Sequence, residues 1–326
     1  MEGRNSTGDF LSKDISISTL ETNIRAFNGP NDTSYCDIKF QTMILLSLIT
    51  SLFGMVLNAI VLWLLGFQMH RNAFLVYILN LAVADFLFLF SQFVYCVLVI
   101  IYTIDSISID MISFLTFMPT FPYLLGLSII TTISVERCLS VMWPIWYHCK
   151  CPRHTSAVIC VLLWALSLVF TFLDGKTYYL LFPYLRFSWT FTFETLEIII
   201  TVWTILLFVV LCGSSLILLV RIFCGSQRIP VTRLYVTIAL TVLFFLIFDL
   251  PFGIYWLLDQ WIDRYCYIYD EIIFLSCINS CANPIIYFLV GSITNHSSFK
   301  MKTLKLFLER AMQDTPEEKE GVESGS

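Results

Sequence analysis

Two aspartates inside long apolar runs are the residues of this sequence best placed to do chemistry. Asp85 stands in the second such run and Asp249 in the sixth. A carboxylate at the centre of a membrane span costs about 2.5–3.5 kcal/mol on an insertion scale. We therefore expect both side chains to face the interior of a helix bundle. Asp249 can there bind a ligand amine, a cation shared with Asp85, or a proton.

Glu136 and Arg137 form an acid–base pair at the end of the apolar run from Ile129 to Val135. Charges at the end of such a run lie at a membrane boundary. Neighbours in a helix do not share a face, so we expect the two side chains to have partners besides each other. In an isolated membrane helix, Arg137 would reach lipid headgroups instead, because its long stem lets the charged head stay in water.

No pattern in the sequence indicates catalysis. HExxH, GxSxG and Walker patterns do not occur, and His70, His148, His154 and His296 lie outside the apolar runs. We expect no enzyme, no cofactor and no metal centre. The net charge of −5 and the scattered Lys and Arg argue against a nucleic-acid partner as well.

The elements that position these residues are long apolar segments. Of 326 residues, 58% are hydrophobic and 13% are charged, which is outside the usual range of soluble proteins. Seven runs reach the roughly 20 residues that cross a bilayer. We predict an all-α membrane protein, a seven-transmembrane helix bundle with spans at residues 42–66, 73–101, 112–142, 155–173, 195–222, 232–258 and 268–291.

Lys and Arg are gathered in the loops on one side of these runs, for example Arg71, Lys150 and Arg228. By the positive-inside rule that side is cytoplasmic. We therefore predict an extracellular N-terminal tail over residues 1–41, a bundle over 42–291 and a cytoplasmic tail over 292–326. After the last span, apolar and basic residues interleave from 299 to 310, which predicts a short amphipathic helix on the membrane lipid.

The opposite side of the membrane is acidic. A mouth of carboxylates between low-dielectric walls raises the local concentration of cations and cationic ligands. A merely solvated acidic rim has the same composition, so both interpretations stand. The carboxylates are Asp105, Asp110, Asp174, Glu194, Glu197, Asp259, Asp263, Asp270 and Glu271, against Lys176, Arg186 and Arg264.

Polar residues in other runs can meet Asp85. We predict a buried polar network that joins it to Asn58 in the first run and to Asn279, Ser280 and Asn283 in the seventh.

Two prolines interrupt the regular bonding of the spans. Pro284 is expected to break the seventh helix, because it removes a backbone donor and frees a carbonyl that side chains or water can bind. Pro251 is expected to kink the sixth span similarly. A bend with two arrangements suits a switch, whereas a lone proline is most often a static kink.

The glycosylation sequons of the tail are at Asn5 and Asn31, and both can be occupied if this end is lumenal. Cysteines within the apolar runs, among them Cys160, Cys212, Cys277 and Cys281, are expected to be buried packing thiols.

Six motifs occur in order, one in each span except the fifth: Asn58, Asp85, Glu136-Arg137, Trp164, Pro251 and Asn283-Pro284-x-x-Tyr287. In this set the chain resembles the rhodopsin-like G-protein-coupled receptors. Longer stretches, such as Asn72-Ala73-Phe74 and Leu211-Cys212-Gly213-Ser214-Ser215-Leu216, resemble the Mas-related G-protein-coupled receptors, in particular the rodent B group.

The resemblance implies a plasma-membrane receptor for cationic or amphipathic peptides or small basic ligands. It implies coupling to heterotrimeric G proteins, often through Gq and calcium, in sensory neurons or mast cells, with roles in itch, nociception or touch. Asp174 and Glu194 match the carboxylates that hold the positive group in relatives. From the residues themselves, the predicted ligand set also contains Asp249 and the aromatic residues Trp189, Phe193 and Trp256, which either supply cation–π contact or form an interfacial belt. The activation and coupling set contains Glu136, Arg137, Pro251, Asn283, Pro284 and Tyr287.

This chain departs from the family pattern at several positions. Tyr178 and Thr190 stand where relatives have a cysteine pair that joins the fourth and fifth spans, so the outer pocket and its ligands are expected to differ. Cys36 and Cys266 are left as a candidate extracellular disulfide. Asp249 stands where many rhodopsin-like receptors have tryptophan. The alternatives are a constitutively active or ligand-independent receptor and, less favoured, a transporter.

Overall fold

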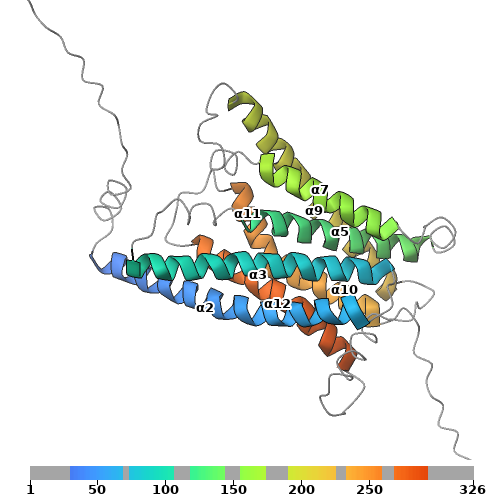
Figure 1. Cartoon of the computed structure of the whole chain (residues 1–326). Coiled ribbons are helices and arrows are strands. Elements are labelled where there is room, and N and C mark those ends of the chain that lie inside the picture. Colours follow the sequence, from blue (N-terminus) through green and yellow to red (C-terminus); the bar gives the residue numbers. More distant parts are fainter. Residues whose placement is uncertain are drawn as a thin grey trace, which may run out of the picture. The chain divides into compact units, whose positions relative to one another are not determined.

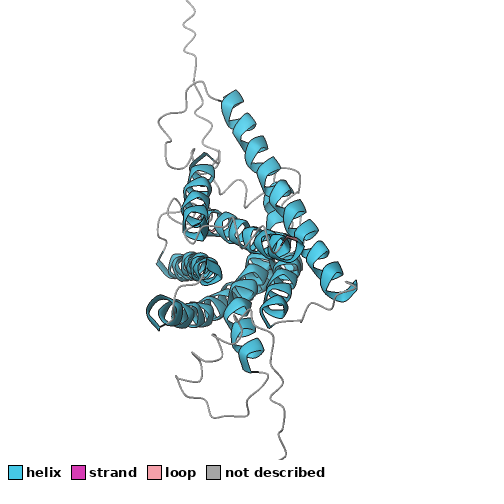
Figure 2. Cartoon of the chain, turned by 90° about the vertical axis from the view of Figure 1, so that its right-hand side faces the viewer, coloured by secondary structure: helices cyan, strands magenta, loops and turns pink. Residues whose placement is uncertain are grey.

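The structure is a computed structural model of the chain. It describes residues 30–68, 73–105, 118–143, 155–173, 190–224, 233–258 and 268–292, and every element among them is helical (Figure 2). The chain divides into two compact units, residues 1–42 and 43–326. The first unit is described from Pro30, where α2 begins, and the second contains the membrane bundle.

Seven helical stretches in the described ranges are long and apolar enough to span a membrane, which confirms the predicted fold class. The predicted amphipathic helix at residues 299–310 lies outside the described residues. The elements are α2 (Pro30–Trp63) with the π-turn η1 (Leu64–Gln68), α3 (Ala73–Asp105), α5 (Thr120–Met142), α7 (Thr155–Leu173), α9 (Thr190–Cys224), α10 (Arg233–Phe244) with the π-turn η3 (Phe245–Asp249) and α11 (Leu250–Leu258), and α12 (Ile268–Ser292).

Prolines determine where α5 begins. The sequence predicted a span from residue 112, but the described helix starts at Thr120, after Pro119 at the N-cap position. Pro122 lies in the first turn, and the first bond runs from the Tyr123 amide to the Pro119 carbonyl at 3.0 Å. Proline has no amide hydrogen, so it fits the first turn of a helix, where amides have no helical acceptor.

Two helices organise the packing within residues 43–326. The first is α5, which contacts α3, α7, α9 and α10, and the second is α12, which contacts α3, α10, η3 and α11 (Figure 1). The largest fully buried side chains lie on these helices and their neighbours, and include Tyr77, Leu127, Phe245 and Tyr287. Among the described helices, exposed large apolar residues are most numerous on α2, α7 and α9.

The length of α3 defines the two ends of the bundle. The Arg137 guanidinium lies 5.2 Å above the Phe74 ring at the start of α3, whereas Tyr95, late in α3, lies near Asp270 in the first turn of α12. At 1.5 Å per residue these positions are about 30 Å apart. We call them the Arg137 end and the Asp270 end. Asp85 lies about midway between them.

The predicted packing thiols are buried at Cys160, Cys277 and Cys281, but Cys212 is exposed, so that prediction is wrong. On α9, Cys212 shares a stripe with Val209 and Leu216, which are both exposed. Residues three and four apart lie on one helix face, and an apolar face in a membrane protein can turn to lipid at no cost.

Candidate functional site

Asp85 is the centre of a polar network in the middle of the bundle. It is 6% exposed, and the Asn283 amide nitrogen donates to its Oδ2 at 2.8 Å. Ser280, one turn earlier on α12, lies beside the same carboxylate. This contact confirms the predicted link between the second and seventh spans.

Asn58 replaces a backbone donor that α12 lacks. Pro284 has no amide hydrogen, so the carbonyl of Ser280, four residues earlier, loses its helical partner. The Asn58 amide nitrogen donates to that carbonyl at 3.0 Å and to the Gly54 carbonyl at 3.0 Å. The predicted break is wrong, because α12 continues through Pro284. The predicted capture of the freed carbonyl by a side chain is confirmed.

Asp249 is buried at the end of a π-turn. It is 7% exposed and closes η3, whose wider bonding includes the Leu250 amide donating to the Phe245 carbonyl. The ring of Pro251 clashes with a carbonyl four residues earlier in a regular helix, and a π-turn just before it relieves that clash. Ser276, Tyr123 and Asp85 lie near the Asp249 carboxylate. The Ser276 hydroxyl lies within hydrogen-bonding reach of that carboxylate.

Glu136 and Arg137 pair with each other at the Arg137 end. The Arg137 Nη2 lies 3.0 Å from Glu136 Oε1, although the two residues are neighbours in α5. Long stems let the charged groups meet beside the helix. The guanidinium is also above the Phe74 ring, so the expectation of a further partner is confirmed for Arg137.

A serine cluster that the sequence did not predict joins α5 to α9. Ser134 Oγ lies 2.9 Å from Ser215 Oγ, and Ser214 Oγ donates to Ser134 Oγ at 2.8 Å. The signal available in the sequence was the Ser214-Ser215 pair within an otherwise apolar run. These bonds fix the position of the fifth span beside the helix that carries Arg137.

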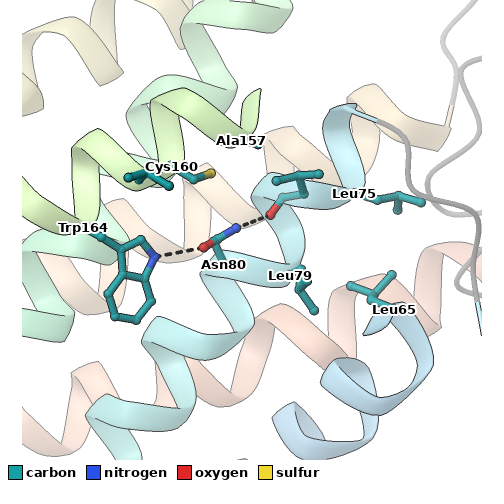
Figure 3. A pocket seen from close by; sticks show the side chains of 9 residues that line it. Leu65, Leu75, Leu79, Asn80, Ala157, Cys160 and Trp164 are labelled. Atoms are coloured by element: carbon teal, nitrogen blue, oxygen red, sulfur yellow. Dashed lines mark hydrogen bonds between the residues drawn. The ribbon is translucent and has the colours of Figure 1, made fainter. Parts of the chain in front are cut away.

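Trp164 binds α7 to α3 at the edge of an apolar cavity (Figure 3). Its indole nitrogen donates to Asn80 Oδ1 at 2.9 Å, while the Asn80 amide nitrogen donates to the Val76 carbonyl at 2.7 Å. Both polar groups are therefore satisfied by protein. The cavity has a volume of about 410 Å³ and is lined by Leu65, Leu75, Val76, Leu79, Asn80, Ala157, Cys160, Val161 and Trp164.

Most of the predicted ligand residues fall outside the part of the chain that the structure describes. Asp174 and Trp189 lie outside the described residues, and the side chains of Phe193, Glu194 and Trp256 are likewise undescribed. The same holds for the predicted sequons and disulfide at Asn5, Asn31, Cys36 and Cys266. These assignments stay predictions.

The remaining predicted residues are described. Tyr287 and Asn279 are buried, with the Tyr287 hydroxyl and the Asn279 Oδ1 lacking a partner, and Pro251 is half-buried. No group of three or more His, Cys, Asp or Glu among the described residues is arranged to hold a metal ion.

Seven apolar spans, a buried carboxylate network and an acid–base pair at one end are features of a membrane receptor. The model of the 7 transmembrane receptor (rhodopsin family) matches residues 57–287. Mas-related G-protein coupled receptor member B2 of Mus musculus is 60% identical over 98% of this chain and 96% of its own length. Member X2 of Mus musculus is 56% identical over 100% of this chain and 93% of its own length. Member B3 of Mus musculus is 54% identical over 94% of this chain and 99% of its own length.

The chain belongs to the Mas-related G-protein-coupled receptors, within the rhodopsin family of seven-transmembrane receptors. The predicted resemblance is confirmed. Proteins of this family are multi-pass plasma-membrane receptors that bind ligands and couple to heterotrimeric G proteins, and they are not enzymes. The family membership excludes the transporter alternative.

Proposed function

We propose that this receptor responds to cationic or amphipathic peptides or small basic ligands. The observation that carries the proposal is the sign of the buried charge. In the described part of the chain, Asp85, Asp249 and Asp270 are buried, and the buried cation is Arg137, which pairs with Glu136. Burying a carboxylate without a countercharge is costly, so these positions favour a positively charged ligand.

The Asp270 end is the entrance of the proposed pocket. Asp270 is 7% exposed in the first turn of α12, beside Glu271, and by the positive-inside rule this end is extracellular. We place the ligand's positive group on Asp174 and Glu194, where charge-assisted hydrogen bonds are available. Trp189, Phe193 and Trp256 supply aromatic faces for cation–π contact.

Activation is proposed to be a population shift. At the Arg137 end, α3, α5 and α10 close on one another around a cavity of only about 10 Å³, lined by residues such as Phe74, Ile133 and Thr237. Between these three helices, the described side chains leave no room for a G-protein helix. The ligand must therefore bind better to an arrangement in which α9 and α10 move apart, because equal affinity for both states shifts nothing.

In this mechanism the shift passes through the Pro251 kink, the Asp85 network and the segment from Asn283 to Tyr287. It then releases Arg137 from Glu136, so that the open end can accept a helix of the G protein. We assign the signal to Gq and calcium release, in sensory neurons or mast cells.

The test is intracellular calcium in cells that express the receptor and receive cationic amphiphilic peptides or small basic amines. Asp174→Asn and Glu194→Gln, at matched surface expression, should each raise the half-maximal concentration more than about tenfold, the equivalent of 1.4 kcal/mol. Glu309→Gln, in the predicted cytoplasmic tail, is the matched control and should not.

Other outcomes of this assay contradict the proposal. If the wild type gives no calcium response, or if both variants respond like the wild type, the proposal that Asp174 and Glu194 bind a cationic ligand is wrong. A high basal signal that no ligand changes would favour the constitutively active alternative.

A further inference from the structure

The serine cluster between α5 and α9 is a polar contact inside an apolar interface. Four buried residues of α9, spaced four, three and four apart, form one face of the helix: Leu207, Leu211, Ser214 and Leu218. Ser134, on α5, is 0% exposed. Buried hydroxyls need hydrogen-bond partners, so these serines must bond either to one another or to the backbones of their own helices.

The Ser214 hydroxyl lies within reach of two acceptors. One is Ser134 Oγ on α5, at 2.8 Å, and the other is the Leu211 carbonyl on its own helix, at 3.2 Å. A hydroxyl has a single proton, so it donates fully to only one acceptor at a time. When α9 moves away from α5, this proton can turn to Leu211, and no buried donor is left unpaired. The bond between the helices can therefore break at little cost.

The serine cluster lies beside the residue that is expected to face the G protein. Ser134 precedes Arg137 by three residues, so both lie on one face of α5, about 4.5 Å apart along its axis. Arg137 is paired with Glu136 and the Arg137 end is closed, so the bonds of the cluster belong to the resting arrangement. Bonds of 2.8 and 2.9 Å are lost when the two helices separate by about 1 Å.

Building on the proposed function, in which α9 and α10 separate, we propose that the serine cluster holds α9 beside α5 in the resting receptor and that its bonds between these helices break on activation. Two hydrogen bonds between membrane helices shift the equilibrium between the two arrangements roughly fivefold. This bias suppresses signalling without ligand, and a bound ligand can overcome it. Ser134, Ser214 and Ser215 are thus positioning residues that set the level of ligand-free activity.

The test is ligand-free G-protein activation by the full-length receptor in cells, at matched surface expression, measured as dissociation of Gα from Gβγ for each class of Gα. Ser134→Ala removes both bonds between the helices and should raise this activity roughly fivefold. Ser214→Ala and Ser215→Ala should each raise it about twofold. Neither should add to the effect of Ser134→Ala, because the bonds are then already absent.

Ser128→Ala is the matched control. Ser128 is also buried in α5, but its hydroxyl donates to the Leu124 carbonyl of its own helix at 2.7 Å. The same substitution there removes a buried hydroxyl without removing a bond to α9, so the ligand-free activity should not change. Ser215 is half-buried, so Ser215→Ala still tests the cluster if Ser134→Ala does not reach the cell surface.

Three results would overturn the proposal. If Ser134→Ala and Ser215→Ala have the ligand-free activity of the wild type, or if Ser128→Ala raises it equally, the cluster is a static contact. If they lower the activity, the bonds belong to the active arrangement. The measurement uses no ligand and every class of Gα, so an error in the proposed ligand or in the assignment to Gq leaves its result unchanged.

Discussion

In soluble proteins the more apolar helix is usually the more buried one, but α7 and α12 show the opposite relation. In the membrane stretch, α7 is the more apolar of the two, yet 17% of its central residues are buried, against 61% for α12. Lipid tails are as apolar as leucine, so an apolar helix gains nothing from turning inward. Polar side chains, which lipid cannot satisfy, are what direct a helix to the interior.

The two helices are also held differently. Close packing against α2, together with side-chain hydrogen bonds to α2 and α3, positions α12. A hydrogen bond from Trp164 links α7 to α3. If this contrast is correct, substitutions at the contacts of α12 should lower stability more than a substitution at the contact of α7.

Asn58→Ala should have the largest effect. It leaves the Ser280 carbonyl buried without a donor, which costs up to about 3 kcal/mol of stability. In a Pro284→Ala background residue 284 supplies that donor, so the cost of Asn58→Ala should fall. Thermal midpoints of the four receptors measure the difference. An equal cost in both backgrounds would show that Asn58 does not replace the missing amide.

Gly54→Ala should come next, because it pushes α2 away from α12. A Cβ atom at Gly54 would overlap Cys281 Sγ and approach Leu89 Cδ1 to 2.7 Å. Overpacking of this kind costs about 1–2 kcal/mol, which again lowers the thermal midpoint. Gly126→Ala is the matched control, since nothing lies within 4 Å of its added Cβ atom. If both variants unfold at the same temperature, a Cβ atom at Gly54 does not disturb the packing of α2 against α12.

Trp164→Phe should have the smallest effect of the three. It keeps an aromatic ring in the wall of the cavity but removes the bond to Asn80, worth about 0.5–1.5 kcal/mol. Its effect should vanish in an Asn80→Ala background, because the acceptor is then already absent. A loss larger than that of Asn58→Ala would overturn the ranking of the two helices.

The sequence was sufficient to predict the seven spans and the buried network, for one physical reason. A charged or amide side chain inside an apolar run cannot face lipid, so Asn58, Asp85 and Asn283 had to meet in the interior. The particular partner of each of these side chains could not be predicted from the sequence. That Asn58 serves the backbone of α12 follows from the geometry of Pro284, which the sequence allowed but did not specify.

Hydroxyl groups gave weaker information than carboxylates or amides. A serine or threonine in a helix can donate to its own backbone, as Thr131 does to the Leu127 carbonyl at 2.7 Å. It therefore needs no partner on another helix, and the cluster of Ser134, Ser214 and Ser215 could not be predicted. The π-turn before Pro251 was missed for a related reason, since a proline predicts a distortion but not its register.

The bond between Asn58 and Ser280 has a consequence for biosynthesis. The first span is made before all the others, and the last span is made after them. The Ser280 carbonyl, left without a helical donor by Pro284, therefore pairs with an Asn58 side chain that was synthesised long before it. This bond between the first and last spans can form only when the last span has been made. A chain without its first span would leave the Ser280 carbonyl unpaired.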